Sequence, residues 1–292
     1  MKKLLFIFFI TFGLAVSTVS CNKDNDFSEV DTTLPLEAVT FYNISYGIHS
    51  EQVYDIYLPA NRSATKTKVI VLVHGGGWTE GDKADMDGFI TLLQENHPSH
   101  AIVNINYVLA NANVKAFPNQ FLDLGKVIDK ITSEKEQLQV LPEFGLIGTS
   151  AGAHISLMYD SVYDTEDKVK FVCDIVGPTN FTDPFYTNNP AWQILLTALV
   201  DETAYPSGTN LAEATSPVFQ VSSNTSPSIL FYGDQDPLVP LSNGELLETN
   251  LINADVTNSF TVYSGGHGNW DAASLLNLQT QLSAFIQAHL SI

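Results

Sequence analysis

A serine stands between two glycines in the stretch Gly148-Thr149-Ser150-Ala151-Gly152, which follows one apolar run and precedes another. The pattern predicts a strand, a sharp turn and a helix. Such a turn exposes the hydroxyl of Ser150 near a helix N-terminus, which favours negative charge. A serine that merely caps the helix is the alternative, because G-x-S-x-G occurs by chance in roughly one chain of this length in ten. Ser150 is therefore a candidate nucleophile that needs partners.

Three glycines follow a second apolar run, in the order His74-Gly75-Gly76-Gly77-Trp78. Because glycines have no side chains, their backbone N–H groups can face a substrate oxygen, as an oxyanion hole requires. A phosphate-binding loop is the rival interpretation, but neither G-x-G-x-x-G nor Gly-Lys-Ser/Thr follows here. We favour an oxyanion hole, with a merely tight loop as the alternative.

An acid and a histidine follow two later strand-like runs. Asp236 comes after the run ILFYG, with Asp234 as a near alternative, and His267 lies among glycines after the run SFTVYSG. A carboxylate at a strand end can hold an imidazole in the required tautomer and stabilise the imidazolium that forms. We predict that Asp236 and His267 serve Ser150 in this way, a solvated loop acid being the alternative for either aspartate.

The other histidines lack such surroundings. We interpret four of them as surface residues: His49, His97, His100 and His289. His154 follows Ser150 by one helical turn, and we interpret it as a packing residue or one that supports the site. Neither H-E-x-x-H nor another paired ligand spacing occurs, so we predict no metal site.

These residues need elements that bring them together. Residues 68–74 form an unbroken apolar run, which is typical of a parallel strand buried on both faces, whereas residues 39–58 alternate like an antiparallel edge pair. Further strands are expected at 101–108, 170–177, 228–232 and 259–263, and helices at 85–96, 118–137, 241–253 and 272–290. This alternation predicts an α/β fold with a doubly wound, mostly parallel sheet. Ligands bind beyond the carboxyl ends of such strands, where all four motifs are expected.

One stretch interrupts the alternation after the sixth predicted strand. Residues 181–227 are rich in Pro, Ser, Thr and Asn and contain one plausible helix, at 191–200. The stretch is too long for an ordinary connection. We predict that it is a functional insertion or lid over the strand ends.

The motifs together resemble those of α/β-hydrolase serine esterases, in which the order is Ser…Asp…His and an HGGG-type loop completes the oxyanion hole. The resemblance covers about residues 38–290 and is closest to esterases with an HGGGW loop, including carboxylesterases and acetyl or feruloyl carbohydrate esterases. It implies a nucleophile (Ser150), a general base (His267), an orienting acid (Asp236) and oxyanion donors on Gly76, Gly77 and Ala151. It implies no cofactor.

The same resemblance places His74 as a support for the glycine loop, and we predict Trp78 and Trp270 as substrate-binding residues. The expected substrate is a carboxylic ester, with acetyl or feruloyl groups on carbohydrate as candidates and a general short-chain carboxylesterase as the alternative. An amidase and a catalytically inactive binding protein on the same fold are further alternatives, although the complete set of motifs speaks against the inactive form.

The N-terminus resembles a bacterial lipoprotein signal. Two lysines and an apolar run precede small residues and Cys21, although Thr18 departs from the usual Leu. We predict a signal peptide at 1–20, lipidation of Cys21, a flexible tether at 21–37 and an α/β-hydrolase domain at 38–292. The protein would then be held in the bacterial cell envelope by its lipid anchor.

Composition restricts the partners. The chain has 32 acidic and 13 basic residues and a net charge of −19, so it lacks the basic surplus that a nucleic acid partner requires. Of its 292 residues 45% are hydrophobic, which is enough for one large core. Cys173, the other cysteine, lies in an apolar run and is expected to be a buried strand residue.

Overall fold

The computed structural model describes residues 35–292. Cys21, the predicted signal peptide and most of the predicted tether therefore lie outside the described residues. Within this range no helix is long and apolar enough to cross a membrane.

Apolar runs that are buried on both faces form the centre of the sheet. Every residue of β3 (Val69–Val73) and β4 (Ala101–Ile105) is buried, and the two strands pair in parallel. β5 (Phe144–Thr149) lies on the other side of β3 in a register that places Val73 opposite Gly148. The ends of β3 and β5 therefore bring the glycine loop and the Ser150 turn side by side.

Eight strands make one sheet in the order β1-β2-β4-β3-β5-β6-β7-β8. The remaining strands are β1 (Val39–Ser45), β2 (Val53–Leu58), β6 (Val169–Ile175), β7 (Ser228–Gly233) and β8 (Asn258–Tyr263). β1 and β2 are antiparallel to each other, and β2 is antiparallel to β4, whereas all other neighbours are parallel. The predicted mostly parallel α/β fold with an antiparallel edge pair is confirmed.

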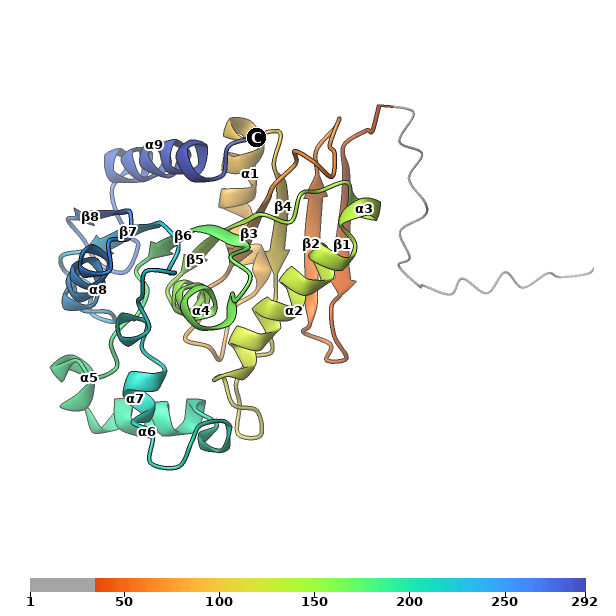
Figure 1. The fold of residues 1–292 in the computed structure, drawn as a ribbon. Coiled ribbons are helices and arrows are strands. Elements are labelled where there is room, and N and C mark those ends of the chain that lie inside the picture. Colours follow the sequence, from red (N-terminus) through yellow and green to blue (C-terminus); the bar gives the residue numbers. More distant parts are fainter. Residues whose placement is uncertain (1–34) are drawn as a thin grey trace, which may run out of the picture.

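Helices cover both faces of the sheet (Figure 1). On one face lie α1 (Asp87–Asn96), which follows the 3₁₀ turn Lys83–Met86, and α9 (Ala272–His289). On the other lie α2 (Asn119–Ser133), α3 (Lys135–Leu138), α4 (Ala151–Met158), which continues as the π-helical turn Tyr159–Tyr163, and α8 (Ser242–Asn253). Each group buries an apolar cluster of its own, so the sheet separates two cores. Cys173 is a free, buried residue of β6, as predicted.

The insertion at 181–227 contains more regular structure than the sequence indicated. The helix expected at 191–200 is present as α6 (Pro190–Leu199). Four short elements accompany it: α5 (Pro184–Thr187), α7 (Leu211–Ala214) and the 3₁₀ turns Glu202–Ala204 and Pro217–Phe219. Asn and Asp residues cap α5, α6 and α7 by accepting hydrogen bonds from backbone N–H groups, which explains their frequency in this stretch.

Two histidines differ from the prediction. His97 and His100 are only 6% and 7% exposed, although we expected both at the surface. The end of α9 folds over the loop that carries them, so that His97 Nε2 lies 2.9 Å from Ser283 Oγ and His100 Nε2 lies 2.8 Å from the Leu290 carbonyl. Their burial depends on a contact with the end of the chain, which local sequence does not reveal.

Candidate active site

Ser150 lies on a strained turn between β5 and α4. Its φ of +50° is in the left-handed region, where a residue with a side chain costs conformational energy. The flanking glycines permit the close packing: a Cβ on Gly148 would lie 2.4 Å from Ala153 N, and one on Gly152 would lie 2.1 Å from the Val73 carbonyl. The turn therefore requires glycine at both positions.

Ser150, His267 and Asp236 form one chain of hydrogen bonds. His267 Nε2 lies 2.9 Å from Ser150 Oγ, and His267 Nδ1 lies 2.7 Å from Asp236 Oδ2. Because the carboxylate accepts, Nδ1 carries the proton and Nε2 is free to accept the serine proton. The arrangement can deprotonate Ser150 and stabilise the imidazolium that results.

The structure distinguishes the two candidate acids. Asp236 contacts His267, whereas Asp234 accepts a hydrogen bond from the Gly265 N–H at 2.9 Å and so holds the loop that carries the histidine. Burial raises the pKa of Asp236, but hydrogen bonds from His267 and from the N–H groups of Leu238 and Val239 outweigh burial, and the pKa lies below its ordinary value. Asp236 thus stays ionised beside the imidazole.

The glycine loop turns back sharply after β3. Gly76 and Gly77 have φ values of +111° and +56°, and a Cβ on Gly76 would lie 2.1 Å from the Glu80 carbonyl. Within residues 35–292 the N–H groups of Gly76, Gly77 and Ala151 donate to no protein acceptor. The three predicted oxyanion donors are therefore free to bind a substrate oxygen, and two of them come from the loop while the third begins α4.

His74 stands at the start of this loop, directly after β3. It is fully buried, its Nδ1 lies 2.6 Å from the Gly75 carbonyl, and its ring stacks on Tyr107 at 4.3 Å. The Tyr107 hydroxyl donates to the His74 carbonyl at 2.9 Å. Burial lowers the pKa of His74, so the ring is a neutral support for the loop, in agreement with the resemblance.

Trp78 is not where a substrate-binding residue would be. It is 2% exposed, does not line the cavity beside Ser150, and packs edge-on against Phe117, His154 and Phe181. The prediction that Trp78 binds substrate is therefore wrong. Its left-handed backbone (φ +65°) turns the indole away from the loop tip and into the core.

An open cavity of about 650 Å³ lies beside Ser150 and His267. It is lined by Gly75, Gly76, Gly77, Asp85, Gly88, Phe89, Leu92, Thr149, Ser150, Ile175, Val176, Leu238, His267, Gly268, Trp270, Leu275, Leu278 and Gln279. Trp270 thus lies at the cavity, and its role in substrate binding stays a prediction. None of residues 181–227 lines it, so the insertion does not cover this cavity in the way that we expected of a lid.

Sequence reasoning missed the helical walls of this cavity. Phe89 and Leu92 belong to α1, and Leu275 and Leu278 belong to α9. Their spacing is that of an ordinary amphipathic helix, so nothing in the pattern separates them from core residues. Leu275 is 41% exposed, so the structure marks it as a surface leucine beside the cavity.

No group of three or more His, Cys, Asp and Glu side chains that could hold a metal ion occurs in residues 35–292. The chemistry available at the site is that of the serine, the imidazole, the carboxylate and the free N–H groups.

Comparison with known proteins identifies a matching family and solved structures of similar fold. Residues 54–251 match the family model described as BD-FAE. An isoprenylcysteine α-carbonyl methylesterase of Arabidopsis thaliana is 24% identical over 249 residues, which are 76% of this chain and 55% of the plant protein. The chain therefore spans about half the length of this curated relative.

Two solved structures show the same fold. A truncated carbohydrate esterase from gut microbiota superposes with a TM-score of 0.69 and 20% identity, over 85% of this chain and 97% of the other. An acetyl ester-xyloside bifunctional hydrolase from Caldicellulosiruptor lactoaceticus gives a TM-score of 0.63 and 18% identity, over 91% and 93% of the chains.

Proposed function

The chain belongs to the BD-FAE family, and from this membership and the geometry at Ser150 we propose that it is a serine esterase that hydrolyses carboxylic esters. One observation carries the proposal: Ser150, His267 and Asp236 are joined by hydrogen bonds of 2.9 and 2.7 Å beside an open cavity. A catalytically inactive protein of this fold would need neither the two hydrogen bonds of His267 nor the strained turn at Ser150.

The reaction proceeds in two halves. Ser150 Oγ attacks the ester carbonyl carbon while His267 Nε2 takes the hydroxyl proton, and the new oxyanion accepts hydrogen bonds from Gly76, Gly77 and Ala151. The tetrahedral intermediate collapses, His267 gives the proton to the leaving alcohol, and the acyl group stays on Ser150. His267 then deprotonates a water molecule, which attacks the acyl carbon. The acyl–Oγ bond breaks, His267 returns the proton to Ser150 Oγ, and the acid leaves.

Replacement of the nucleophile tests this function. We expect Ser150→Ala to lower kcat for a short-chain nitrophenyl ester by at least about 10⁴-fold, because only binding and oxyanion stabilisation remain. Ser161→Ala is the matched control, since its hydroxyl contacts the Thr225 hydroxyl at 3.1 Å and neither residue lines the cavity. An active Ser150→Ala variant, or a wild type that cleaves no ester and resists a fluorophosphonate probe, would refute the proposal.

We propose acetyl or feruloyl groups on carbohydrate as the substrate class. The names of the structural neighbours, a carbohydrate esterase and an acetyl ester-xyloside hydrolase, support a carbohydrate ester. The cavity walls offer apolar side chains, among them Phe89, Leu238 and Trp270, which suit an aromatic acyl group better than an acetyl group.

A general short-chain carboxylesterase is the second candidate, because the same apolar walls would accept an alkyl chain. Purified protein should be given acetylated xylan, a feruloylated oligosaccharide and a series of nitrophenyl esters of increasing chain length. A higher kcat/KM on either carbohydrate ester supports the first candidate, whereas a preference for simple alkyl esters supports the second.

We further propose that the protein is anchored in the bacterial cell envelope through a lipid on Cys21, on the strength of the N-terminal sequence alone. Fractionation of cells that express the full chain tests this. Wild-type protein should sediment with membranes, and Cys21→Ala should not; equal distribution of the two would refute the anchor.

A further inference from the structure

His154 lies one helical turn after Ser150 and contacts Ser150, Trp78 and Thr215. It lies on α4, its backbone N–H donates to the Ser150 carbonyl at 3.1 Å, and its side chain is fully buried. The rings of Phe117, Phe121 and Phe181 lie within 5.5 Å of the imidazole, measured between centroids. The ring is therefore fixed in place and cannot reach the reacting atoms.

The hydrogen bonds of this imidazole define its tautomer. The indole Nε1 of Trp78 lies 3.2 Å from His154 Nδ1, and His154 Nε2 lies 2.8 Å from the Thr215 carbonyl. An indole N–H only donates and a carbonyl only accepts, so Nδ1 accepts and Nε2 carries the proton. Burial lowers the pKa of His154 to about 4, which keeps the ring neutral at neutral pH.

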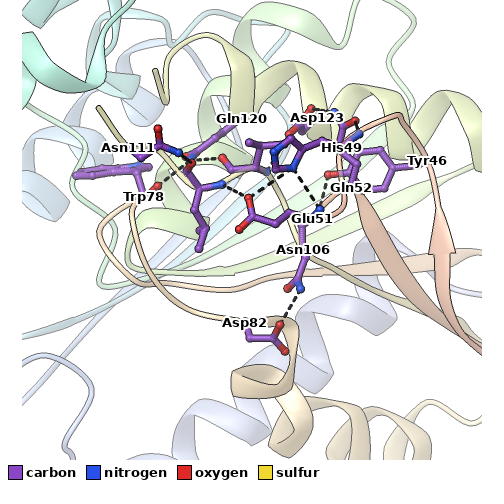
Figure 2. A network of polar contacts seen from close by, with 12 residues as sticks. Tyr46, His49, Glu51, Gln52, Trp78, Asp82, Asn106, Asn111, Gln120 and Asp123 are labelled. Carbon is purple, nitrogen blue, oxygen red and sulfur yellow. Dashed lines mark hydrogen bonds and ion pairs between the residues drawn. The ribbon is translucent and has the colours of Figure 1, made fainter. Parts of the chain in front are cut away.

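Trp78 directly follows the last glycine of the oxyanion loop, and its backbone is held as firmly as its indole. Its carbonyl accepts hydrogen bonds from Ala110 N at 2.9 Å and from Gln120 Nε2 at 2.8 Å. Figure 2 shows Gln120 beside Trp78, and the far end of the loop held where Asn106 donates to Asp82 at 2.7 Å. The position of Trp78 therefore sets the position of Gly77.

The other hydrogen-bond partner of the His154 imidazole, Thr215, belongs to the insertion. Thr215 is fully buried, and it follows α7 directly, with its N–H donating to the Leu211 carbonyl. Thus one neutral imidazole joins the oxyanion loop, the nucleophile helix and the insertion.

We propose that His154 is a positioning residue that keeps the two halves of the oxyanion hole in register. Gly76 and Gly77 contribute donors from the loop after β3, whereas Ala151 contributes its donor from α4. The donors can bind one oxygen together only if the loop and the helix keep a fixed distance, and the Trp78–His154 hydrogen bond joins these two elements directly. The insertion, through Thr215, supports this link and so acts on the site without lining it. The proposal rests on the proposed esterase function.

Kinetics provide the first test. We expect His154→Phe, which keeps a ring but neither hydrogen bond, to lower kcat about 10- to 100-fold with little change in KM, because misplaced donors weaken transition-state binding more than substrate binding. His154→Asn, which keeps an acceptor near the Nδ1 position, should recover most of the activity. Phe181→Leu is the control for lost packing around the same ring and should keep nearly full kcat.

An equal kcat for His154→Phe and Phe181→Leu, or a loss that appears only in KM, would overturn the proposal. A wild type without esterase activity would instead refute the proposed function, so the two failures are distinguishable.

Nuclear magnetic resonance gives a second test, which needs no enzymatic activity. The ¹⁵N shifts of the His154 ring, assigned by comparison with His154→Asn, should show the neutral Nε2–H tautomer. Among the three tryptophans of the chain, the Trp78 indole proton, assigned with Trp78→Phe, should show the downfield shift of a strong hydrogen bond and lose it in His154→Phe. An Nδ1–H tautomer would exclude the Trp78 contact and overturn the inference.

Discussion

Asp236 reaches His267 because the turn after β7 buries its carboxylate and directs two backbone N–H groups at it. An amide in its place would favour the wrong imidazole tautomer, because it presents a donor to Nδ1. We expect Asp236→Asn to lower kcat about 10³- to 10⁴-fold, as measured by steady-state hydrolysis of a nitrophenyl ester.

Asp234→Asn is the matched control for this prediction. The Asp234 carboxylate accepts a hydrogen bond from the Gly265 N–H and does not contact His267. We therefore expect kcat to fall by less than about tenfold in this variant. A larger loss in Asp234→Asn than in Asp236→Asn would contradict the assignment of the acid.

The two tryptophans show what residue-level prediction can and cannot do. Both follow glycine-rich loops, so the sequence placed both near the site. Trp270 lines the cavity, whereas the backbone of Trp78 turns its indole into the aromatic core. The direction of one side chain depends on one φ value, and no pattern in the local sequence reveals that value.

At the scale of elements, the glycines that let α4 approach β3 are decisive. Gly152 leaves no room for a side chain, because an added Cβ would meet the backbone carbonyls of Val73 and His74 at 2.1 and 2.4 Å. We expect Gly152→Ala to lower the free energy of unfolding by about 3 kcal/mol, measured by urea denaturation.

Gly88→Ala is the contrasting change in α1. A Cβ there would meet nothing within 4 Å, and alanine restricts the unfolded chain more than glycine does. We expect a gain of about 0.5–1 kcal/mol in the free energy of unfolding. If both variants changed stability in the same direction, the packing argument for Gly152 would fail.

The sequence predicted where the insertion lies along the chain but not which part of the structure it contacts. Its length and composition marked it as an addition to the sheet, and its main helix was confirmed as α6. Its contacts were not predictable: it packs on the side of Trp78 and His154 and leaves the cavity open.

At the scale of the whole molecule, buried carboxyl groups make stability depend on pH. Burial raises the pKa of Asp160 to about 7, against which hydrogen bonds from Ser226 act. The folded protein then holds a proton that the unfolded chain releases near pH 4, so this contribution is fully present below that pH and is lost as the pH rises through about 7.

The test compares wild type with Asp160→Asn, in which this position no longer titrates. Between pH 6 and 8 the wild type should lose about 1 kcal/mol more of its unfolding free energy than the variant. Denaturation at several pH values measures the difference, and parallel pH profiles for the two proteins would contradict it. Burial also raises the pKa of Asp174 to about 7, so part of the wild-type trend should remain in the variant.

The sequence by itself determined the class of fold and two residues of the predicted triad, Ser150 and His267. Residues 69–73 are apolar at every position, which is typical of a strand buried on both faces, and parallel strands place their following loops at one edge. Chain order and glycine spacing then singled out Ser150 and His267, and left Asp236 and Asp234 as alternatives.

Only the tertiary structure showed which aspartate contacts His267 and that the Trp78 indole lies in the core. It also showed that α1 and α9 line the cavity and that Trp78 donates a hydrogen bond to His154. These features depend on backbone angles and on contacts between residues far apart in the chain, such as the 76 positions that separate Trp78 from His154. Local composition and periodicity carry no record of such contacts, because they arise only when the sheet has brought its elements together.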